Sequence, residues 1–548
     1  MAASGQDRFD VIIIGAGLSG MYQLHLLRKL GFSVCVVDAA GDLGGVWYWN
    51  RYPGCRVDSE SYTYGYSFSD EILDGWEWSE LYSSQPENLR YLRRAAELLD
   101  VRKDMQFNAR VTGMTFDEAS AQWTLEFADG SRMRATFVIA ATGPLSAPQY
   151  PAVEGRGSFQ GEAYHTAAWP RDEAGTGGAP VCFDGKRIGV VGTGGSGVQM
   201  IQEIAKSTAE LYVFQRTPNW CMPLGNHVLS DEEKRDIRAK QKRIFEDCLK
   251  TFSGFNYGFL DKSVFDAGEA EREALFEKLY HEHGFGLWLG NYNDILFDPR
   301  ANAIVSDFVA RKIRQRVKDP AVAEKLIPKN HGFGTRRVPL ETRYYEAYNQ
   351  PNVHLVDIKE DPLERINAAG IKTAARQYDL DMIVYATGFD AVRGALDRID
   401  IRGRDGRALK DKWTDGPVTY LGLQYSGFPN LLAVVGPQSG ATFCNIPRCA
   451  EPQIRWVADL LGHMKQRGLR YVEATAEAEA EWTHHVNEMV SQTLFATATD
   501  SWFFGGGGNV AGRTPSTKTF LAYTGGNPAY RARCDEVAAK GYAGFTLK

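Results

Sequence analysis

Two copies of one glycine-rich pattern constrain the fold of this chain more than any other feature of its sequence. In each copy a short apolar segment, at 9–14 and at 186–191, runs into glycines spaced as GxGxxG. The glycines are Gly15, Gly17 and Gly20 in the first copy and Gly192, Gly194 and Gly197 in the second. A strand that ends in such a turn and continues into a helix is typical of a Rossmann βαβ unit, whose glycines permit a tight turn and let the backbone approach a pyrophosphate. The sequence therefore predicts two separate dinucleotide-binding domains.

The residues after the second strand of each unit predict which dinucleotide binds. Asp38 follows the strand 33–37 of the first unit, at the position where an acid binds the ribose hydroxyls. In the second unit Arg216 and Thr217 stand there, and an arginine favours the 2′-phosphate of NADP over NAD. A solvated surface position is the alternative for Arg216. Two such domains imply a redox relay in which a nicotinamide passes a hydride to a second dinucleotide, for which we expect FAD.

The pattern of strands, helices and charged stretches divides the chain into five segments. Two charged stretches with helical spacing, 231–250 and 269–281, predict a helical insertion, and glycines at 171–180 predict a flexible surface loop. The predicted fold class is α/β, with two Rossmann-like dinucleotide-binding domains, for FAD and NADP, and a helical insertion. The expected segments are the FAD domain, first part, at 1–146; the NADP domain, first part, at 147–223; the insertion at 224–331; the NADP domain, second part, at 332–386; and the FAD domain, second part, at 387–548, with a mobile loop near 501–515.

Composition and charge exclude several other classes of protein. The 548 residues include 62 Lys and Arg and 68 Asp and Glu, a net charge of −6 that is too mild and too mixed for a nucleic-acid surface. No apolar run approaches the ~20 residues of a membrane span, and the first ten residues resemble no secretory signal, so we expect a cytoplasmic location. The eight cysteines have no metal-binding spacing, which predicts reduced thiols and no metal site.

Reduced flavin can pass its electrons to a disulfide, to a partner protein or quinone, or to O2. Disulfide reductases with two nucleotide domains carry a cysteine pair soon after the first unit, but only Cys55 lies near it here. Cys444 and Cys449 stand late in the chain, and we interpret them as buried small side chains rather than a redox pair. The chain therefore lacks the cysteine pair that a disulfide reductase of this type requires.

Two long motifs carry a resemblance to a known family. Residues 159–170 match FxGxxxHxxxWP through Phe159, Gly161, His165 and Trp169, and residues 44–58 match GGxWxxxxYPGxxxD through Gly44, Gly45, Trp47, Tyr52, Pro53, Gly54 and Asp58. The chain resembles the type I Baeyer-Villiger monooxygenases, flavoproteins that insert oxygen beside a ketone carbonyl. Related flavin monooxygenases that oxidise nitrogen or sulfur typically have Phe or Tyr at the place of Trp169. The resemblance covers nearly the whole chain and looks closest to the branch of camphor-pathway and cyclic-ketone monooxygenases.

The resemblance also implies roles for individual residues. NADPH reduces the FAD, O2 gives a flavin peroxide, and its attack on the ketone gives a tetrahedral adduct that becomes an ester or lactone. Arg337 corresponds to the arginine over the flavin, whose guanidinium keeps its proton and stabilises the anion, and Asp58 to the acid that pairs with it. Arg336 corresponds to the basic position that helps Arg216 and Thr217 hold the 2′-phosphate. From spacing alone, the two arginines would be solvated and Asp58 would be a turn residue.

The remaining site residues are expected around the two cofactors and the substrate. Trp47 and Tyr52 are expected to wall the flavin or to be plain core aromatics, and His165 to tether the linker between domains or to contact the nicotinamide. The expected cofactor-binding residues are Gly15, Gly17, Gly20, Asp38, Gly45, Trp47, Tyr52, Asp58, Gly192, Gly194, Gly197, Gln199, Arg216, Thr217, Arg336, Arg337 and Trp502. The substrate-pocket candidates are Leu145, Ser146, Gln438, Ser439, Thr442 and Phe443.

The sequence predicts an enzyme that uses FAD, NADPH, O2 and a small-molecule ketone. It predicts no nucleic-acid or membrane partner, and a monomer or homodimer. Two alternatives stay open: a flavin monooxygenase that acts mainly on sulfides or amines, and a flavin-linked electron carrier that serves a protein partner.

Overall fold

The first glycine-rich unit forms the centre of an eight-stranded sheet. Strand β1 (Arg8–Ile14) pairs in parallel with β2 (Val34–Val37) on one side and with β6 (Arg132–Ala140) on the other. The sheet order is β17-β4-β5-β6-β1-β2-β3, and β18 also pairs with β6. The other strands are β3 (Met105–Gln106), β4 (Val111–Asp117), β5 (Gln122–Phe127), β17 (Asp400–Arg402) and β18 (Leu431–Ala433). The computed structural model describes residues 7–171, 180–441, 444–498, 501–504 and 519–548.

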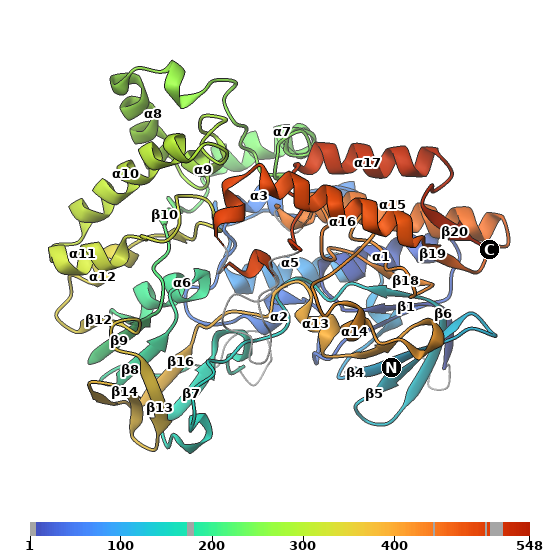
Figure 1. Ribbon diagram of the computed structural model, residues 1–548, viewed down its shortest axis with the longest axis horizontal. Coiled ribbons are helices and arrows are strands. Elements are labelled where there is room, and N and C mark those ends of the chain that lie inside the picture. Colours follow the sequence, from blue (N-terminus) through green and yellow to red (C-terminus); the bar gives the residue numbers. More distant parts are fainter. Residues whose placement is uncertain (1–6, 172–179, 442–443, 499–500, 505–518) are drawn as a thin grey trace.

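Helix α1 (Leu18–Lys29) follows β1 and packs between the sheet and α15 (Ile446–Gln466). Its buried side chains include Met21, Leu24 and Leu27, which recur at helical spacing and face the core. The segment after β18 thus returns to cover the first helix of the chain, and Figure 1 shows α15 beside α1.

The second glycine-rich unit forms a separate, all-parallel sheet. Its order is β12-β9-β8-β16-β7, with β8 (Arg187–Val191) and β9 (Glu210–Gln215) from the unit itself. The other strands are β7 (Glu162–His165), β12 (Val353–Asp357) and β16 (Met382–Tyr385). Helix α6 (Gly195–Ile204) joins β8 to β9, and a small antiparallel sheet of β13 (Leu363–Asn367), β14 (Gly370–Thr373) and β15 (Gln377–Asp379) lies next to it. Figure 1 shows the two main sheets at opposite sides of the lower half of the molecule.

The charged region between the two parts of the second sheet forms helices, which extend from the top centre to the left side of Figure 1. They are α7 (Asp231–Cys248), α8 (Glu269–His281), α9 (Gly286–Leu289), α10 (Pro299–Arg316) and α11 (Pro320–Leu326). Helix α7 begins with a capping box of Ser230 and Glu233, whereas Asp298 and Asp319 cap α10 and α11 just before a proline. Such caps satisfy backbone amides that have no partner in the first turn, which explains where the helices start.

Shorter elements connect these three parts. The remaining helices are α2 (Val46–Trp49), α3 (Ser61–Tyr64), α4 (Asp70–Asp74), α5 (Gln85–Leu98), α12 (Tyr344–Ala347), α13 (Gly394–Asp397), α14 (Leu409–Lys412), α16 (Ala476–Ser491) and α17 (Asn527–Ala539). The remaining strands are β10 (Met222–Pro223), β11 (Leu340–Glu341), β19 (Val472–Ala474) and β20 (Phe545–Leu547).

The predicted α/β fold with two Rossmann-like units and a helical insertion is confirmed. The exact segment boundaries stay a prediction, although β17 and β18 do join the first sheet after β16 has completed the second. Most of the two predicted loops, at 171–180 and 501–515, lies outside the described residues.

The prediction of eight unpaired cysteines was wrong for one pair. Cys444 and Cys449 are both buried, as expected, but the structure joins them in a disulfide. They flank the start of α15, and the first turn of that helix brings their Cα atoms to 6.3 Å from each other. Sequence spacing alone could not show that a helix begins between them.

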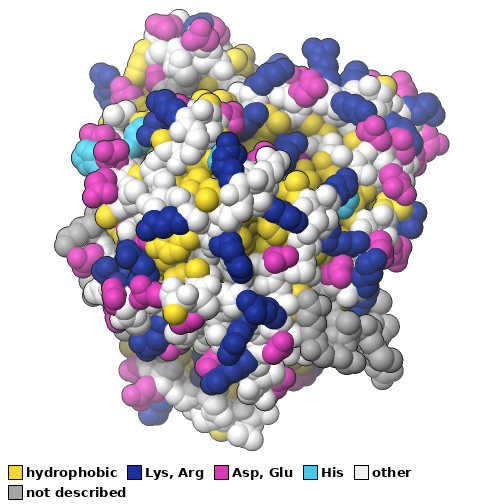
Figure 2. Space-filling view, turned by 90° about the vertical axis from the view of Figure 1, so that its right-hand side faces the viewer, with side chains coloured by type: hydrophobic (Ala, Val, Ile, Leu, Met, Phe, Trp, Pro, Cys, Tyr) yellow, Lys and Arg dark blue, Asp and Glu magenta, His cyan; other side chains and the backbone are white. Residues whose placement is uncertain are grey.

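Charges of both signs are spread over the molecular surface. On the face shown in Figure 2, Lys and Arg side chains and Asp and Glu side chains both occur, with hydrophobic side chains between them. Across the described part of the chain, no helix combines the length and the apolar character needed to span a membrane, and no group of three His, Cys, Asp or Glu side chains gathers to hold a metal ion.

Candidate functional site

The glycines of the first unit are required by the close approach of three backbone segments. Gly15 has a φ of +114°, and a Cβ there would lie 2.4 Å from the carbonyl oxygen of Ala141. A Cβ on Gly20 would lie only 1.9 Å from the carbonyl oxygen of Gly15, so α1 could not approach β1 with a larger residue. No side chain caps the first turn of α1. Its amides therefore fit the pyrophosphate of FAD.

Asp38 lies at the end of β2, beside this loop. Its carboxylate accepts hydrogen bonds from the backbone amides of Ala16 and Ala40, both at 2.7 Å. Burial raises the pKa of Asp38, and the two amides oppose that effect. Because each carboxylate oxygen has a further lone pair, the residue fits the ribose hydroxyls of a dinucleotide held on the loop.

The second loop repeats this geometry with open space at its centre. A Cβ on Gly192 (φ +107°) would lie 2.5 Å from the Ala386 carbonyl oxygen, and one on Gly197 would lie 2.3 Å from that of Gly192. Around Gly194, by contrast, no described atom lies within 4 Å of such a Cβ. Helix α6 also begins without a side-chain cap. This loop fits a second pyrophosphate.

Two arginines lie near each other beside the second loop. Arg216 follows β9 and is exposed, whereas Arg336 is half-buried in the segment before β11. Burial and, secondly, the charge of Arg216 lower the pKa of Arg336 to about 10. Thr217 adjoins Arg216, and its carbonyl accepts a hydrogen bond from Thr193 at 3.2 Å. Two neighbouring guanidinium groups repel each other unless an anion lies between them, so this pair fits a 2′-phosphate.

The structure brings Arg337 and Asp58 together from distant parts of the chain. Nη2 and Nε of Arg337 donate to the two carboxylate oxygens of Asp58 at 2.7 and 3.1 Å. The guanidinium also lies over the ring of Phe285, 5.4 Å from its centroid. About a third of each charged side chain is exposed, 35% for Arg337 and 29% for Asp58. The guanidinium is therefore fixed by one bidentate ion pair while part of its surface stays accessible.

Residues from both family motifs line one pocket of about 400 Å³. Tyr52, Pro53 and Gly54 come from the first motif and Trp169 from the second, and the pocket also contains Phe183. Its other lining residues are Arg51, Cys55, Arg56, Ser84, Gln85, Pro86, Pro180 and Val181. A volume of this order suits part of a dinucleotide or a small organic molecule.

Tyr52 also connects the two nucleotide-binding parts. Its hydroxyl donates to Gln199 Oε1 on α6 at 2.8 Å, and Gln199 Nε2 donates to the Arg56 carbonyl at 3.2 Å. Trp47, on α2, donates through Nε1 to the Tyr64 hydroxyl at 3.2 Å and meets its ring edge-on. Gly45 lies beside Gly17, with a Cβ position 2.9 Å from the Gly17 Cα atom. These contacts place the first motif directly on the first glycine loop.

His165 contacts the linker between the sheets rather than a pocket. Its Nδ1 accepts from the Ala167 amide at 3.0 Å, and its Nε2 lies 3.1 Å from the Gln149 carbonyl oxygen. Burial lowers the pKa of His165, which favours the neutral ring. Phe159 and Gly161 precede it, where a Cβ on Gly161 would lie 2.5 Å from the Asp381 carbonyl oxygen. The motif thus includes the edge strand β7 and fixes the linker.

The structure does not gather the substrate-pocket candidates into one cavity. Leu145 is 42% exposed and Ser146 is also exposed, whereas Gln438 and Ser439 are completely buried. Gln438 Oε1 accepts from Thr419 and Thr483, and Nε2 donates to the Pro417 carbonyl, which fits a packing role better than a substrate contact. Thr442 and Phe443 lie outside the described residues. Trp502 is half-buried and packs on Phe503.

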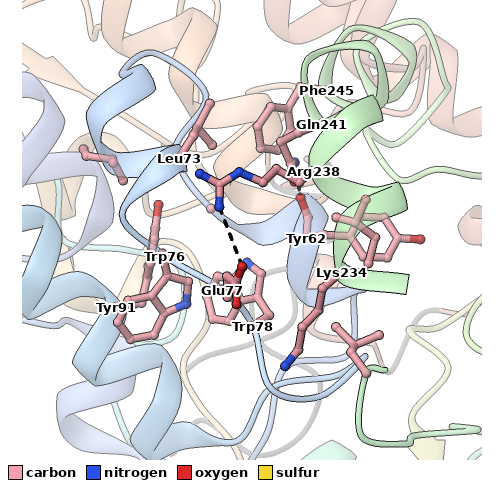
Figure 3. A pocket seen from close by; sticks show the side chains of 14 residues that line it. Tyr62, Leu73, Trp76, Glu77, Trp78, Tyr91, Lys234, Arg238, Gln241 and Phe245 are labelled. Carbon is pink, nitrogen blue, oxygen red and sulfur yellow. Dashed lines mark hydrogen bonds and ion pairs between the residues drawn. The ribbon is translucent and has the colours of Figure 1, made fainter. Parts of the chain in front are cut away.

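A second, smaller crevice lies between α7 and the segment that contains α3 to α5 (Figure 3). Trp76, Trp78 and Tyr91 line one side, and Arg238 reaches across from α7 to Glu77 at 3.6 Å. Its volume of about 50 Å³ is far below that of the first pocket and of an ordinary ligand site. No residue of the predicted site lines it among the described residues.

Sequence reasoning missed Phe285, which supports Arg337, and Tyr64, which bonds to Trp47. Neither residue carries a sequence signal, because an aromatic side chain in a helical or loop segment is ordinarily a core residue.

Comparisons with known proteins agree with this geometry. Residues 9–243 match the family model described as pyridine nucleotide-disulphide oxidoreductase. The chain is 49% identical to a 2-oxo-Delta(3)-4,5,5-trimethylcyclopentenylacetyl-CoA monooxygenase of Pseudomonas putida, over 98% of both chains. It is 38% identical to the phenazine N-monooxygenase PhzNO1 of Lysobacter antibioticus, over 100% of this chain and 98% of that protein. It is 36% identical to a Baeyer-Villiger monooxygenase of Pseudooceanicola batsensis, over 97% and 95%.

The fold likewise matches that of a solved flavoprotein. A crystal structure of OTEMO in complex with FAD and NADP superposes with a TM-score of 0.95 at 49% identity, over 98% of this chain and 99% of that one. Sequence identity of 49% over nearly the full length shows membership of the same family as well as a shared fold. The chain belongs to the type I Baeyer-Villiger monooxygenases, the FAD-containing, NADPH-dependent flavoproteins that insert one oxygen atom of O2 next to a ketone carbonyl.

Proposed function

We propose that Arg337 is the catalytic cation of this monooxygenase and that Asp58 holds it in position. The observation that carries the proposal is the bidentate ion pair between them, which is partly exposed and stacked on Phe285. An arginine suits this role because its guanidinium remains protonated and can donate several hydrogen bonds at once to a developing oxyanion.

The overall reaction balances without a further reactant. A ketone, O2, NADPH and one proton give an ester or lactone, NADP⁺ and water, so one oxygen atom enters the product and the other leaves as water. Bound FAD, once reduced, supplies the activation of O2. Arg216, Thr217 and Arg336 would hold the 2′-phosphate, and Asp38 would hold the ribose of FAD. Arg337 would stabilise negative charge that develops on oxygen during the reaction.

We propose a small-molecule ketone as the substrate class. A sulfide or amine is the second candidate, since a relative that is 38% identical is named as an N-monooxygenase. Trp169 favours the ketone, because the resemblance associates Phe or Tyr at this place with nitrogen and sulfur oxidation. Incubation with equal amounts of a cyclic ketone and an aryl sulfide, followed by product analysis, distinguishes the two. A cytoplasmic location and a monomeric or homodimeric state are proposals that fractionation and sedimentation test.

Arg337→Ala tests the catalytic assignment. We expect anaerobic reduction of the flavin by NADPH to continue, while ester formation falls by about a hundredfold or more, because one preorganised oxyanion donor is typically worth that much. Arg311→Ala is the matched control, since Arg311 pairs with Glu273 on the surface of the insertion. Ester formation at the control rate in Arg337→Ala would remove Arg337 from the mechanism.

A further inference from the structure

A buried cluster of one carboxyl and two phenol groups lies close to the segments that hold Arg337. Glu60 is 1% exposed and Tyr82 is completely buried. The hydroxyls of Tyr82, at 3.1 Å, and of Tyr257 both donate to Oε1 of Glu60. Oε2 of Glu60 is buried and has no hydrogen-bond partner among the described residues. The side-chain donors to this carboxyl in the described structure are thus two neutral phenols, and neither proposed catalytic residue bonds to it.

The cluster joins two parts of the chain that are far apart in sequence. Glu60 precedes α3, whereas Tyr257 belongs to the helical insertion between α7 and α8. The hydroxyl of Tyr257 also lies 3.3 Å from the carbonyl oxygen of His283. The segment before α9 is therefore attached to the segment before α3 through Tyr257.

Gly284 shows how tightly the insertion packs on the cluster. It has a φ of +75°, and a Cβ there would lie 2.3 Å from the hydroxyl oxygens of both Tyr82 and Tyr257 and 3.0 Å from Glu60 Oε1. The backbone at Gly284 therefore lies directly against all three polar groups. A side chain at this position would displace at least one of them.

Each of the two attached segments also carries a residue that contacts the guanidinium of Arg337. Asp58, two residues before Glu60, forms the bidentate ion pair with the guanidinium, and Phe285, the residue after Gly284, forms the ring under it. One end of Arg337 is thus fixed from the Glu60 side of the cluster and one face from the Gly284 side. A change in the cluster would move these two supports relative to each other.

The electrostatics of the cluster favour directional bonds over an ion pair. Burial raises the pKa of Glu60, and burial likewise raises the pKa of Tyr257 well above its usual value. Other titratable groups that interact with Glu60 include His283, Tyr62 and Cys248, and none of these is a lysine or an arginine. Hydrogen bonds that hold a carboxyl between two phenols fix distance and angle, which is what a positioning device requires.

We propose that Glu60 is a positioning residue for Arg337: together with Tyr82 and Tyr257 it sets the spacing between Asp58 and Phe285, the two supports of the guanidinium. This inference rests on the proposed catalytic role of Arg337. Glu60 itself touches neither Arg337 nor a cofactor loop in the described hydrogen bonds, so its effect on the reaction passes through Asp58 and Phe285.

Tyr257→Phe and Glu60→Ala, prepared as FAD-loaded enzymes, test the proposal. We expect the ester formed per NADPH consumed to fall about three- to tenfold, with hydrogen peroxide making up the difference, because a misplaced cation fails to stabilise the oxygen transfer. Anaerobic flavin reduction by NADPH should change by less than about twofold, since the glycine loops and Arg216 are not involved. Glu60→Gln keeps one oxygen acceptor and should retain most of the wild-type coupling.

Tyr348→Phe is the matched control. Its hydroxyl donates to Tyr344 at 2.9 Å in a buried site that does not contact Arg337, so coupling should stay at the wild-type value. Hydrogen exchange supplies a readout apart from activity: in Tyr257→Phe we expect faster exchange at 57–64 and 283–288 and unchanged exchange in β1. Wild-type coupling in both Tyr257→Phe and Glu60→Ala, or equal losses in Tyr348→Phe, would overturn the inference.

Arg337→Ala, measured in parallel, separates this inference from the proposed function. If Arg337→Ala still forms ester at the control rate, the catalytic assignment fails, and the positioning role of Glu60 fails with it. If Arg337→Ala is inactive while the cluster variants are fully coupled, only the positioning role fails.

Discussion

The proposed role of Arg337 depends on its ion pair with Asp58, which the sequence around Arg337 does not reveal. Arg337 is 279 residues away from Asp58, and its aromatic support, Phe285, lies in an insertion with no sequence motif. Spacing alone favoured a solvated pair of arginines at 336–337, and only the family motifs pointed to the ion pair. Phe285 carried no signal at all. At the scale of single residues, the pairing of Arg337 with Asp58 could be predicted because family motifs include both residues, whereas the contact with Phe285 could not.

Arg216 gives the prediction that belongs to this scale. We expect Arg216→Ala to raise the KM for NADPH about tenfold or more and to leave the KM for NADH within about twofold, since a charge-assisted contact to phosphate contributes on the order of 1.5–3 kcal/mol. Steady-state kinetics with both nucleotides check this. Arg187→Ala is a suitable control, because that exposed arginine pairs with Asp381 at the opposite end of β8. Equal effects of Arg216→Ala on both nucleotides would contradict the phosphate role.

The elements that could be predicted are those whose signal is local. Strands β1 and β8 and helices α1 and α6 follow from a short apolar run, three glycines and a helical repeat, which are contiguous in the sequence. Gln438 shows what local patterns do not predict. It has a φ of +64° and is buried, and its side chain accepts hydrogen bonds from Thr419 and Thr483, which no local pattern indicates. The disulfide of Cys444 and Cys449 likewise depends on where α15 begins.

The two glycine loops give a paired prediction at the scale of elements. In Gly20→Ala the new Cβ would meet the Gly15 carbonyl at 1.9 Å and push α1 away from β1, whereas in Gly197→Ala it would meet the Gly192 carbonyl at 2.3 Å and displace α6. We expect Gly20→Ala to lose FAD, and Gly197→Ala to keep FAD but bind NADP⁺ at least about tenfold more weakly.

The ratio of flavin to protein absorbance and a titration with NADP⁺ measure the two effects. Gly157→Ala, where no described atom lies within 4 Å of the added Cβ, controls for a general effect of alanine. Loss of the same cofactor from both loop variants would show that the two loops do not bind separate dinucleotides.

Hydride transfer requires the whole molecule to hold two cofactors at a fixed distance. The loop of the first sheet fits one dinucleotide and the loop of the second sheet fits the other, and Figure 1 shows that the two sheets are separate. Among the contacts between these parts, Tyr52 with Gln199 and Gln199 with the Arg56 carbonyl connect a family motif directly to the first helix of the second unit. This link lies beside the pocket that both motifs line, so it is placed to set how the two cofactors approach each other.

We expect removal of this link to slow the transfer without removing either cofactor. Tyr52→Phe and Gln199→Leu should each lower the rate of anaerobic flavin reduction about fivefold, which corresponds to roughly 1 kcal/mol, the ordinary net value of one hydrogen bond. The double variant should be no slower than Gln199→Leu alone, because that substitution already removes the bond to Tyr52 together with the one to the Arg56 carbonyl. Stopped-flow reduction at saturating NADPH measures the rate, and flavin content with NADP⁺ affinity shows that both sites remain intact. Fully additive losses in the double variant would mean that each side chain acts separately on its own cofactor, and that the two domains are aligned by other contacts.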